Sequence, residues 1–270
     1  MTYQDDKHSA YDELAPYYDE LQAEVDHQAF AVYLDGIVSA ETAGTEPQGE
    51  AGRMLWLDLG CGTGSFLMEI DRLGYDCIGI DLAEGMLMEA REKAWESGRG
   101  TEILLLEQDI TDFELYGSVN VISIVLDTLN HLADRAAVMA MLERCRTYLH
   151  QGGLLVFDVL TEERAQETLG DRQFFVVEDD FALFWSNQYN QETKRVKAEL
   201  TIFETESDTG LYKRSDTAVE EQIYSHDEVV GMLKESGFEL LRCKPVDAGF
   251  GQMDGEKRGA AESRMVYFAK

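Results

Sequence analysis

Hydrophobic and polar positions follow two different patterns along the chain. Between residues 54 and 159, short apolar runs typical of buried strands alternate with segments whose apolar residues recur every three or four positions, as on one face of a helix. The runs cover residues 54–59, 77–80, 103–106, 119–126 and 154–159, and helices are expected up to Gly74 and over 84–97 and 133–149. Strands that alternate with helices predict a parallel α/β sheet.

From residue 174 onward the helical spacing disappears. Residues 174–177, 181–189, 196–204 and 217–224 are strand-like, with turns expected at 187–193 and 207–210. Hairpin-joined strands pair antiparallel, so residues 171–224 are predicted to form an inserted antiparallel β subdomain over one edge or face of the parallel core. A capping-box pattern at Ser225 and Glu228 then opens a helix that ends near Ser236, and strands are expected over 238–243 and 264–269.

The segment before the sheet is predicted to be helical. Leu14, Tyr18 and Leu21 recur at helical spacing, and Pro16 places a boundary or a kink within residues 9–38. Residues 43–52 are polar and contain three glycines, which is typical of a loop or linker. We therefore expect an N-terminal helical unit over 1–42 and a core built from 53–160 and 225–270.

Composition narrows the classes of function. The 270 residues fit one large domain or one domain with an insertion. With 23 Lys and Arg against 53 Asp and Glu, the net charge is −30, which disfavours nucleic acids and anionic membranes as partners. No apolar run reaches the roughly 18 residues of a membrane span, and the acidic N-terminus is no signal peptide. The four cysteines form no Cys-x-x-Cys pair or zinc spacing, so we expect no metal site and a reduced, cytoplasmic location.

The stretch from Leu57 to Ser65 carries the clearest chemical signal. It follows a predicted strand, opens a helix and holds glycines at 60, 62 and 64, which let a ligand approach the backbone closely. Asp81 stands 21 residues after Gly60, at the end of the next strand, where a carboxylate meets a ribose diol. A dinucleotide-binding turn needs its third small residue at position 65, whereas here the glycine is at 64. The spacing favours a nucleoside ligand without a phosphate.

These residues resemble motif I of the class I S-adenosylmethionine-dependent methyltransferases. Further landmarks of that family follow in order: Gly79-Ile-Asp-Leu-Ala83, Glu107-Gln-Asp-Ile110, Val121-Ile-Ser-Ile-Val-Leu-Asp127 and Gly152-Gly-Leu-Leu-Val-Phe-Asp158. The resemblance covers residues 54–159 closely and extends in element order over 225–269. It implies a Rossmann-like sheet of seven strands, parallel with one antiparallel strand, flanked by helices.

The N-terminal segment resembles one small bacterial branch of this family. Its pattern is Tyr11-x(5)-Tyr-Tyr18-Asp19, and the fourth strand is followed by Asp127-Thr-Leu-Asn130-His131. In that branch the leading helix covers the cofactor. Tyr11 and Tyr18 are therefore expected as part of a lid, with helix packing as the alternative.

The resemblance implies S-adenosylmethionine as cofactor and S-adenosylhomocysteine as product. Contacts are expected from Tyr11, Tyr18, Asp58, Gly60, Cys61, Gly62, Gly64, Asp81, Leu82, Gln108, Asp109, Ile110 and Leu126. Asp58 is expected at the amino group of the methionine part, Asp81 at the ribose, and Asp109 at the adenine with Ile110 beneath the ring. The alternatives are helix caps for Asp58 and Asp81, a solvated loop residue for Asp109 and a packing residue for Cys61.

The expected reaction is direct methyl transfer to an O, N, S or C nucleophile of a small molecule. His131 is a candidate general base, with a packed or solvated histidine as the alternative. Asp127 is expected to contact the cofactor, position the acceptor, or cap the helix that follows. The inserted strands are expected to wall only the acceptor side. Exposed aromatic residues there, such as Trp185 and Tyr189, are expected to affect turnover, with a place in the core of the small sheet as the alternative.

Three other functions stay open from the sequence alone. They are a protein or peptide methyltransferase, a non-catalytic cofactor-binding regulatory module, and a nicotinamide-dependent oxidoreductase, against which the glycine spacing argues. The acceptor, the methylated atom and the oligomeric state are not determined.

Overall fold

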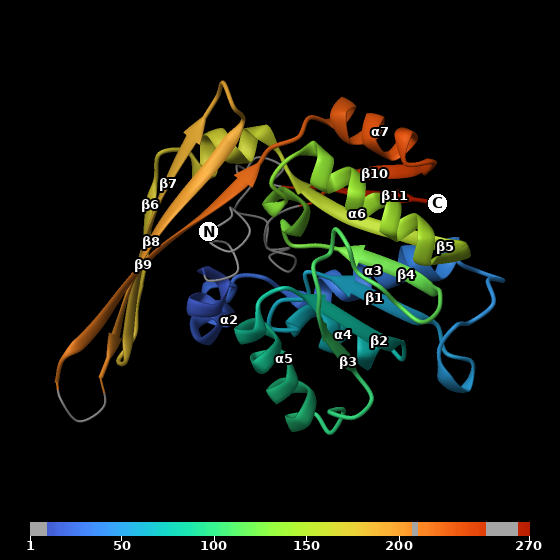
Figure 1. Ribbon diagram of the computed structural model, residues 1–270, viewed down its shortest axis with the longest axis horizontal. Helices are drawn as coiled ribbons and strands as arrows, with labels where there is room; N and C mark the ends of the chain where they lie inside the picture. Colours follow the sequence, from blue (N-terminus) through green and yellow to red (C-terminus); the bar gives the residue numbers. More distant parts are fainter. Residues whose placement is uncertain (1–9, 207–209, 247–263) are drawn as a thin grey trace, which may run out of the picture.

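The computed structural model describes residues 10–206, 210–246 and 264–270. Its centre is a seven-stranded sheet in the order β10-β11-β5-β4-β1-β2-β3 (Figure 1). The strands are β1 (Leu55–Leu59), β2 (Asp76–Asp81), β3 (Leu104–Glu107), β4 (Val119–Ile124), β5 (Leu149–Leu160), β10 (Leu240–Val246) and β11 (Arg264–Ala269). Only β11 runs antiparallel to its neighbours β5 and β10. The predicted sheet, parallel with one antiparallel strand, is confirmed.

Strand bounds shift by a few residues from the apolar runs. β5 begins at Leu149 instead of 154, because Leu149 already pairs with Val119 where α6 (Arg135–Tyr148) runs directly into the strand. β10 lies two residues later than expected, since Gly237 and Phe238 belong to the end of α7 (His226–Glu235). These shifts leave every strand of the core in its predicted order.

Helices cover both faces of the sheet, as expected for alternating strands and helices. One face packs on α3 (His27–Glu41), α4 (Ser65–Arg72) and α5 (Glu84–Glu96), through buried residues such as Phe30, Leu67 and Leu87. The other face packs on α6 and α7, through Met141 and Met232. The predicted capping box of α7 is present, since Ser225 and Glu228 each accept from the other's backbone N–H. Both faces of the sheet are therefore covered by helices, and a ligand is expected at the carboxyl ends of its strands.

The inserted region forms a separate four-stranded antiparallel sheet, as predicted. Its order is β6 (Gln173–Val177), β7 (Phe181–Asn190), β8 (Arg195–Thr205) and β9 (Tyr212–Gln222). This sheet is long and curved, and it projects from one side of the core (Figure 1). The turn expected over 187–193 is wrong in its bounds, because Asn187 still pairs with Ala198 and the turn follows Asn190. Of the turn expected over 207–210, residues 207–209 lie outside the described residues.

β9 begins five residues earlier than the sequence pattern indicated. Tyr212 pairs with Thr205 at the end of β8, and the polar residues 213–216 continue the pairing to Thr217. The ladder therefore runs along the whole of β8. These residues are mostly exposed, so their polarity concealed a strand that has a solvated face. The 3-10 turn η3 (Thr128–His131) and the π-helical turn η4 (Arg164–Leu169) were not predicted.

The N-terminal segment lies between the two sheets. Residues 10–14 are helical, and the helix breaks at Pro16 into the 3-10 turn η1 (Ala15–Tyr17) and α2 (Tyr18–Leu21), as predicted. A second break over residues 22–26, which was not predicted, separates α2 from α3, and η2 (Glu50–Gly52) lies in the later linker. Ala10 and Leu14 are buried against the inserted sheet, and the ring of Tyr17 lies 4.4 Å from that of Phe181. The inserted sheet thus supports the segment that was expected to cover the cofactor. In the described ranges, no helix has both the length and the apolar character to cross a membrane.

Candidate functional site

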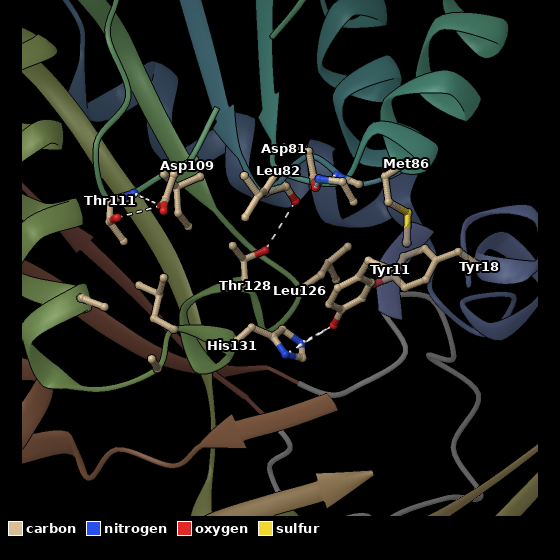
Figure 2. A pocket seen from close by; sticks show the side chains of 17 residues that line it. Tyr11, Tyr18, Asp81, Leu82, Met86, Asp109, Thr111, Leu126, Thr128 and His131 are labelled. Carbon is tan, nitrogen blue, oxygen red and sulfur yellow. Dashed lines mark hydrogen bonds between the residues drawn. The ribbon is translucent and has the colours of Figure 1, made fainter. Parts of the chain in front are cut away.

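Three cavities open at the carboxyl ends of the parallel strands. Cavity A, of about 170 Å³, is lined by Tyr11, Tyr18, Gly60, Gly62, Asp81, Leu82, Ala83, Met86, Asp109, Ile110, Thr111, Leu126, Thr128, His131, Leu132, Ala133 and Ala137 (Figure 2). Cavity B, of about 190 Å³, lies between residues 11–22, the turn after β4 and the inserted sheet. Cavity C, of about 40 Å³, lies beside Asp58 and residues 60–66. Tyr18 and Leu126 line all three, so the cavities meet at these two side chains.

The glycine turn forms one wall of cavity A. Gly60 has φ +71°, and a Cβ there would lie 2.3 Å from Cγ2 of Thr128. Gly62 has φ +54°, and the nearest atom to its position of a Cβ is a ring carbon of Tyr18 at 3.9 Å. The backbone therefore stays bare beneath Tyr18, and glycine is required at Gly60 by both conformation and space.

Asp81 ties this turn to the start of α5. Its Oδ2 accepts the N–H of Gly62 at 2.8 Å, and its Oδ1 accepts the N–H of Ala83 at 2.9 Å. Asp81 does not cap α5, since Ala83 is the N-cap residue. Asp81 lines cavity A, and because a carboxylate accepts several hydrogen bonds it suits a ligand that brings hydroxyl donors.

The wall of cavity A opposite the glycine turn is formed by residues that come after β3 in the chain. Asp109 accepts the N–H and the hydroxyl of Thr111, at 2.8 and 2.7 Å, and Ile110 lies beside them. Met86 enters from α5 on the opposite side (Figure 2). A carboxylate above apolar side chains suits a flat ring that carries an amino group.

Asp58 lies buried at the floor of cavity C. Its Oδ1 accepts the hydroxyl of Ser123 at 2.6 Å, and that hydroxyl accepts the indole N–H of Trp56 at 2.7 Å. Burial raises the pKa of Asp58 to about 7, opposed by the Ser123 hydrogen bond. Asp58 is not a helix cap, because Gly64 is the N-cap of α4. A buried carboxyl in this position favours a cationic partner in cavity C.

The turn after β4 is conformationally strained. Leu126 and Asp127 both have positive φ, 58° and 69°, which costs about 1–3 kcal/mol for each residue. Asp158 on β5 accepts the N–H of Leu126 at 2.9 Å and that of Asp127 at 3.0 Å. Buried Arg264 on β11 pairs with Asp127 at 2.5 Å and with Asp158 at 3.6 Å. Residues of two other strands therefore hold the turn at the junction of the three cavities.

Tyr11 and His131 meet where cavities A and B join. The Tyr11 hydroxyl lies 2.9 Å from Nε2 and 3.3 Å from Nδ1 of His131 (Figure 2). Burial, followed by the charges of Tyr18, Glu221, Asp81 and Asp127, raises the pKa of Tyr11. Tyr11 therefore stays protonated and can donate a hydrogen bond to the imidazole.

Asp19 ties the N-terminal segment to the glycine turn. It accepts the hydroxyls of Thr63 at 2.7 Å and Ser65 at 3.1 Å, and it pairs with Lys93 at 2.5 Å. Asp12 also accepts the N–H of Gly85 at 2.7 Å, at the start of α5. These contacts hold Tyr11 and Tyr18 over cavity A.

Most of the residues singled out from the sequence lie together, and a few do not. Cavity A contains Tyr11, Tyr18, Gly60, Gly62, Asp81, Leu82, Asp109, Ile110, Leu126 and His131; Asp58 and Cys61 line cavity C, and Asp127 lines cavity B. Gly64 and Gln108 line none of the three, because Gly64 starts α4 against Ala90 and Gln108 bonds to Glu114. Asp127 does not cap α6, since Asp134 is its N-cap and accepts the N–H of Ala137.

Of the two aromatic residues singled out on the inserted sheet, one lines a cavity and the other does not. Trp185 lines cavity B, whereas Tyr189 bonds to Glu162 outside it. Cys61 packs against Gly79, and burial raises the pKa of its thiol, which keeps it an unreactive packing residue in this environment. Within the described part of the chain, no group of three or more His, Cys, Asp or Glu side chains could hold a metal ion.

Sequence reasoning missed several lining residues. Met86 and Thr111 stand next to recognised landmarks, and their positions after β2 and β3 were a usable signal. Asn187 and Glu221, by contrast, lie in cavity B on strands of the inserted sheet, far along the chain from the glycine turn. Only the packing of the two sheets brings them there.

Comparisons with known proteins agree with this geometry. Residues 57–153 match the family model described as "Methyltransferase domain". A protein of Geobacillus sp. (strain WCH70), named "Putative methyltransferase", is 29% identical over 86% of this chain and 90% of its own length. The crystal structure of an S-adenosylmethionine-dependent methyltransferase from Clostridium acetobutylicum superposes with a TM-score of 0.76, at 23% identity, over 97% of this chain and 98% of that one. An amino pentose methyltransferase from Micromonospora echinaspora, solved with bound S-adenosylmethionine, superposes with a TM-score of 0.64, at 18% identity, over 93% and 94%.

Proposed function

We propose that this chain is a class I S-adenosylmethionine-dependent methyltransferase that methylates a small molecule bound in cavity B. The single observation that carries the proposal is the meeting of three cavities at Tyr18 and Leu126. A methyl donor needs a site for its nucleoside, a site for its amino-acid part and an opening toward the acceptor. We assign the nucleoside to cavity A, the amino-acid part to cavity C and the acceptor to cavity B, and the three cavities meet at one point.

The residues of cavities A and C fit the cofactor. The bare backbone at Gly60 and Gly62 leaves room for the nucleoside, and Asp81 has the acceptor sites for the ribose hydroxyls. Asp109 and Ile110 suit the amino group and the face of the adenine. Asp58 suits the ammonium group of the methionine part, because a buried carboxyl gains most from a cationic partner.

When bound, S-adenosylmethionine supplies an electrophilic methyl group on a sulfonium. The protein then has to position the acceptor, exclude water and accept a proton from a protic nucleophile. Tyr18 and Leu126 close the junction, while Asp158 and Arg264 hold Leu126 in place. His131 lies on cavities A and B and is our candidate for the proton acceptor.

The lining of cavity B favours a small acceptor over a protein chain. Its walls come from the N-terminal segment, the turn after β4 and three strands of the inserted sheet, and its lining includes Trp185, Leu200 and Val219. Asn187 is 4% exposed, and its Nδ2 has no hydrogen-bond partner among the described residues. A buried amide donor on a mostly apolar wall suits an acceptor molecule that carries an oxygen. Residues 171–224 are thus proposed as the acceptor-side subdomain. Of the lid expected over residues 1–42, residues 1–9 lie outside the described residues and α3 packs on the core sheet, so the proposed lid is residues 10–22.

Two measurements test the proposal in sequence. S-adenosylhomocysteine should raise the melting temperature in a concentration-dependent way, since a ligand that binds only the folded state stabilises it. Release of S-adenosylhomocysteine from S-adenosylmethionine is then followed across a library of amines, alcohols, thiols and carbon acids. Amino sugars belong in this library, because the amino pentose methyltransferase shares the fold. Absence of any thermal shift at millimolar ligand would remove the cofactor assignment; methylation of peptides but of no small molecule would favour the protein-substrate alternative.

A further inference from the structure

The inserted sheet places a carboxylate beside His131. Oε1 of Glu221, on β9, lies 3.6 Å from Nε2 of His131, and both side chains are about four-fifths buried. Both residues line cavity B. A carboxylate at this distance stabilises the charged imidazolium more than the neutral imidazole.

The backbone around this pair is held on both sides. Nδ2 of Asn130, the residue before His131, donates to the carbonyl oxygen of Gln222 at 2.7 Å, directly after Glu221. Oδ1 of the same amide accepts the N–H of Leu160 at 3.0 Å, at the end of β5. Asn130 is fully buried. One amide therefore ties η3 to both sheets and holds Glu221 and His131 in a common position.

We propose that Glu221 is a positioning residue for His131, so that the inserted sheet supplies half of a proton-accepting pair and the acceptor is a protic amine or hydroxyl compound. This inference rests on the proposed function, since it concerns proton transfer at the same site. As the acceptor atom forms its bond to the methyl carbon, its N–H or O–H bond breaks and the proton passes to the imidazole. The methyl–sulfur bond breaks with its electron pair left on sulfur. Glu221 then faces the new positive charge on the ring.

Other charged groups near His131 do not replace Glu221. The ionisable residues of the two cavities that His131 lines are Tyr11, Tyr18, Asp81, Asp109, Asp127 and Glu221. Asp127 pairs with Arg264, and Asp81 is bonded to the glycine turn. Tyr11 contacts the imidazole through a neutral hydroxyl, and Arg195 of β8 donates to the carbonyl of Ala133 nearby. The Glu221 carboxylate lies within ion-pair distance of His131, at 3.6 Å.

The first test needs no acceptor. The protein has five histidines, and the NMR signal of His131 is assigned by its loss in His131→Asn. Glu221→Gln should lower the pH midpoint of this signal by about one unit, the effect expected for a charge at this distance even in a water-like dielectric. Glu221→Asp should keep the midpoint close to that of the wild type. Glu199→Gln is the matched control, because Glu199 lies on β8 with its side chain half exposed and pairs with Lys197. An unchanged midpoint in Glu221→Gln would overturn the proposal.

The second test uses the acceptor found in the library. Glu221→Gln should lower kcat at neutral pH by about 10- to 100-fold, shift the acidic limb of the pH profile, and leave S-adenosylhomocysteine affinity unchanged. Glu221→Asp should recover most of kcat. A kcat that falls equally in both variants, with no shift of the pH profile, would make Glu221 merely structural and refute the pairing. Failure of the proposed function is distinct, because it appears as lost ligand binding or as no methylated small molecule in the wild type.

Discussion

Cavity A, proposed to hold the cofactor, and cavity B, proposed to hold the acceptor, are assembled in different ways. Cavity A takes most of its lining from residues 60–137, in loops that follow β1 to β4 of one parallel sheet. Cavity B combines residues 11–22, the turn after β4, Leu169 and strands β7 to β9. The first site follows from strand order, since parallel strands bring their carboxyl ends to one edge. The second depends on how a separate sheet and the N-terminal segment pack together.

The two regions also differ in how they use polar groups. The core buries Asp58, Asp158 and Arg264 and satisfies them with hydrogen bonds or ion pairs. The inserted sheet exposes large apolar side chains such as Phe175 and Phe184. It also buries Asn187, whose Nδ2 has no hydrogen-bond partner in the part of the chain that the structure describes. The core therefore holds a fixed geometry, which fits the proposal that the inserted sheet is the part that presents polar groups to the acceptor.

The largest expected effect breaks the polar network of the core. Arg264→Met leaves Asp158 buried without its cation, and loss of one partner of a buried ion pair costs about 3–5 kcal/mol in unfolding free energy. Urea unfolding of the two proteins measures the difference. Arg242→Met is the control: Arg242 pairs with Glu41 at the surface, where such a pair contributes at most about 1 kcal/mol. Equal losses in both variants would contradict the role given to the network.

The next effect concerns cofactor affinity on the core side. Asp81→Ala should weaken S-adenosylhomocysteine binding about 10- to 100-fold, because charge-assisted hydrogen bonds to the ribose are lost along with those to the turn. Isothermal titration calorimetry measures the dissociation constant. Glu107→Ala provides the comparison, since Glu107 is exposed and pairs in register with Asp81 on the next strand. If the two variants bind alike, Asp81 serves only the turn.

The raised pKa of Asp58 predicts that cofactor binding depends on pH. Burial raises this pKa to about 7, so the carboxyl becomes neutral as the pH falls below that value. A neutral carboxyl no longer attracts the ammonium group, and affinity for S-adenosylhomocysteine should drop about tenfold from about pH 8 to about pH 6. The dependence should vanish in Asp58→Asn. A wild-type affinity that stays constant over this range would rule out the assigned contact.

The smallest expected effect tests whether the two regions act separately. The sequence predicted that inserted strands would influence the acceptor alone, yet Phe181 packs on Tyr17 of the segment that covers cavity A. Phe181→Ala should therefore weaken S-adenosylhomocysteine binding a few-fold, although Phe181 lines none of the cavities, and it should lower the melting temperature. Phe175→Ala, on the exposed face of β6, should change neither. If a folded Phe181→Ala protein binds S-adenosylhomocysteine as tightly as the wild type, the inserted strands influence the acceptor alone, as the sequence predicted.

Local sequence patterns were sufficient to predict the strands of the core and several residues of cavity A. Apolar runs and glycine positions located β1 to β5, the glycine turn and Asp81, because each depends on residues close in the chain, whereas Asp109 came from the family resemblance. The same approach ended β7 too early and began β9 too late. Strands with a solvated face have a weak apolar pattern, and only their pairing partners define their length.

The sequence by itself determined the fold of the core, the class of ligand and the side of the sheet that holds it. Only the tertiary structure decided the rest. It turned Leu126 and Asp127 into a strained turn held by Asp158 and Arg264, and it brought Glu221 to His131. These contacts join residues that are distant in the chain, through ion pairs and packing between separate sheets. No periodicity in the sequence encodes such partners, because the free energy that selects them arises only when the whole chain has packed.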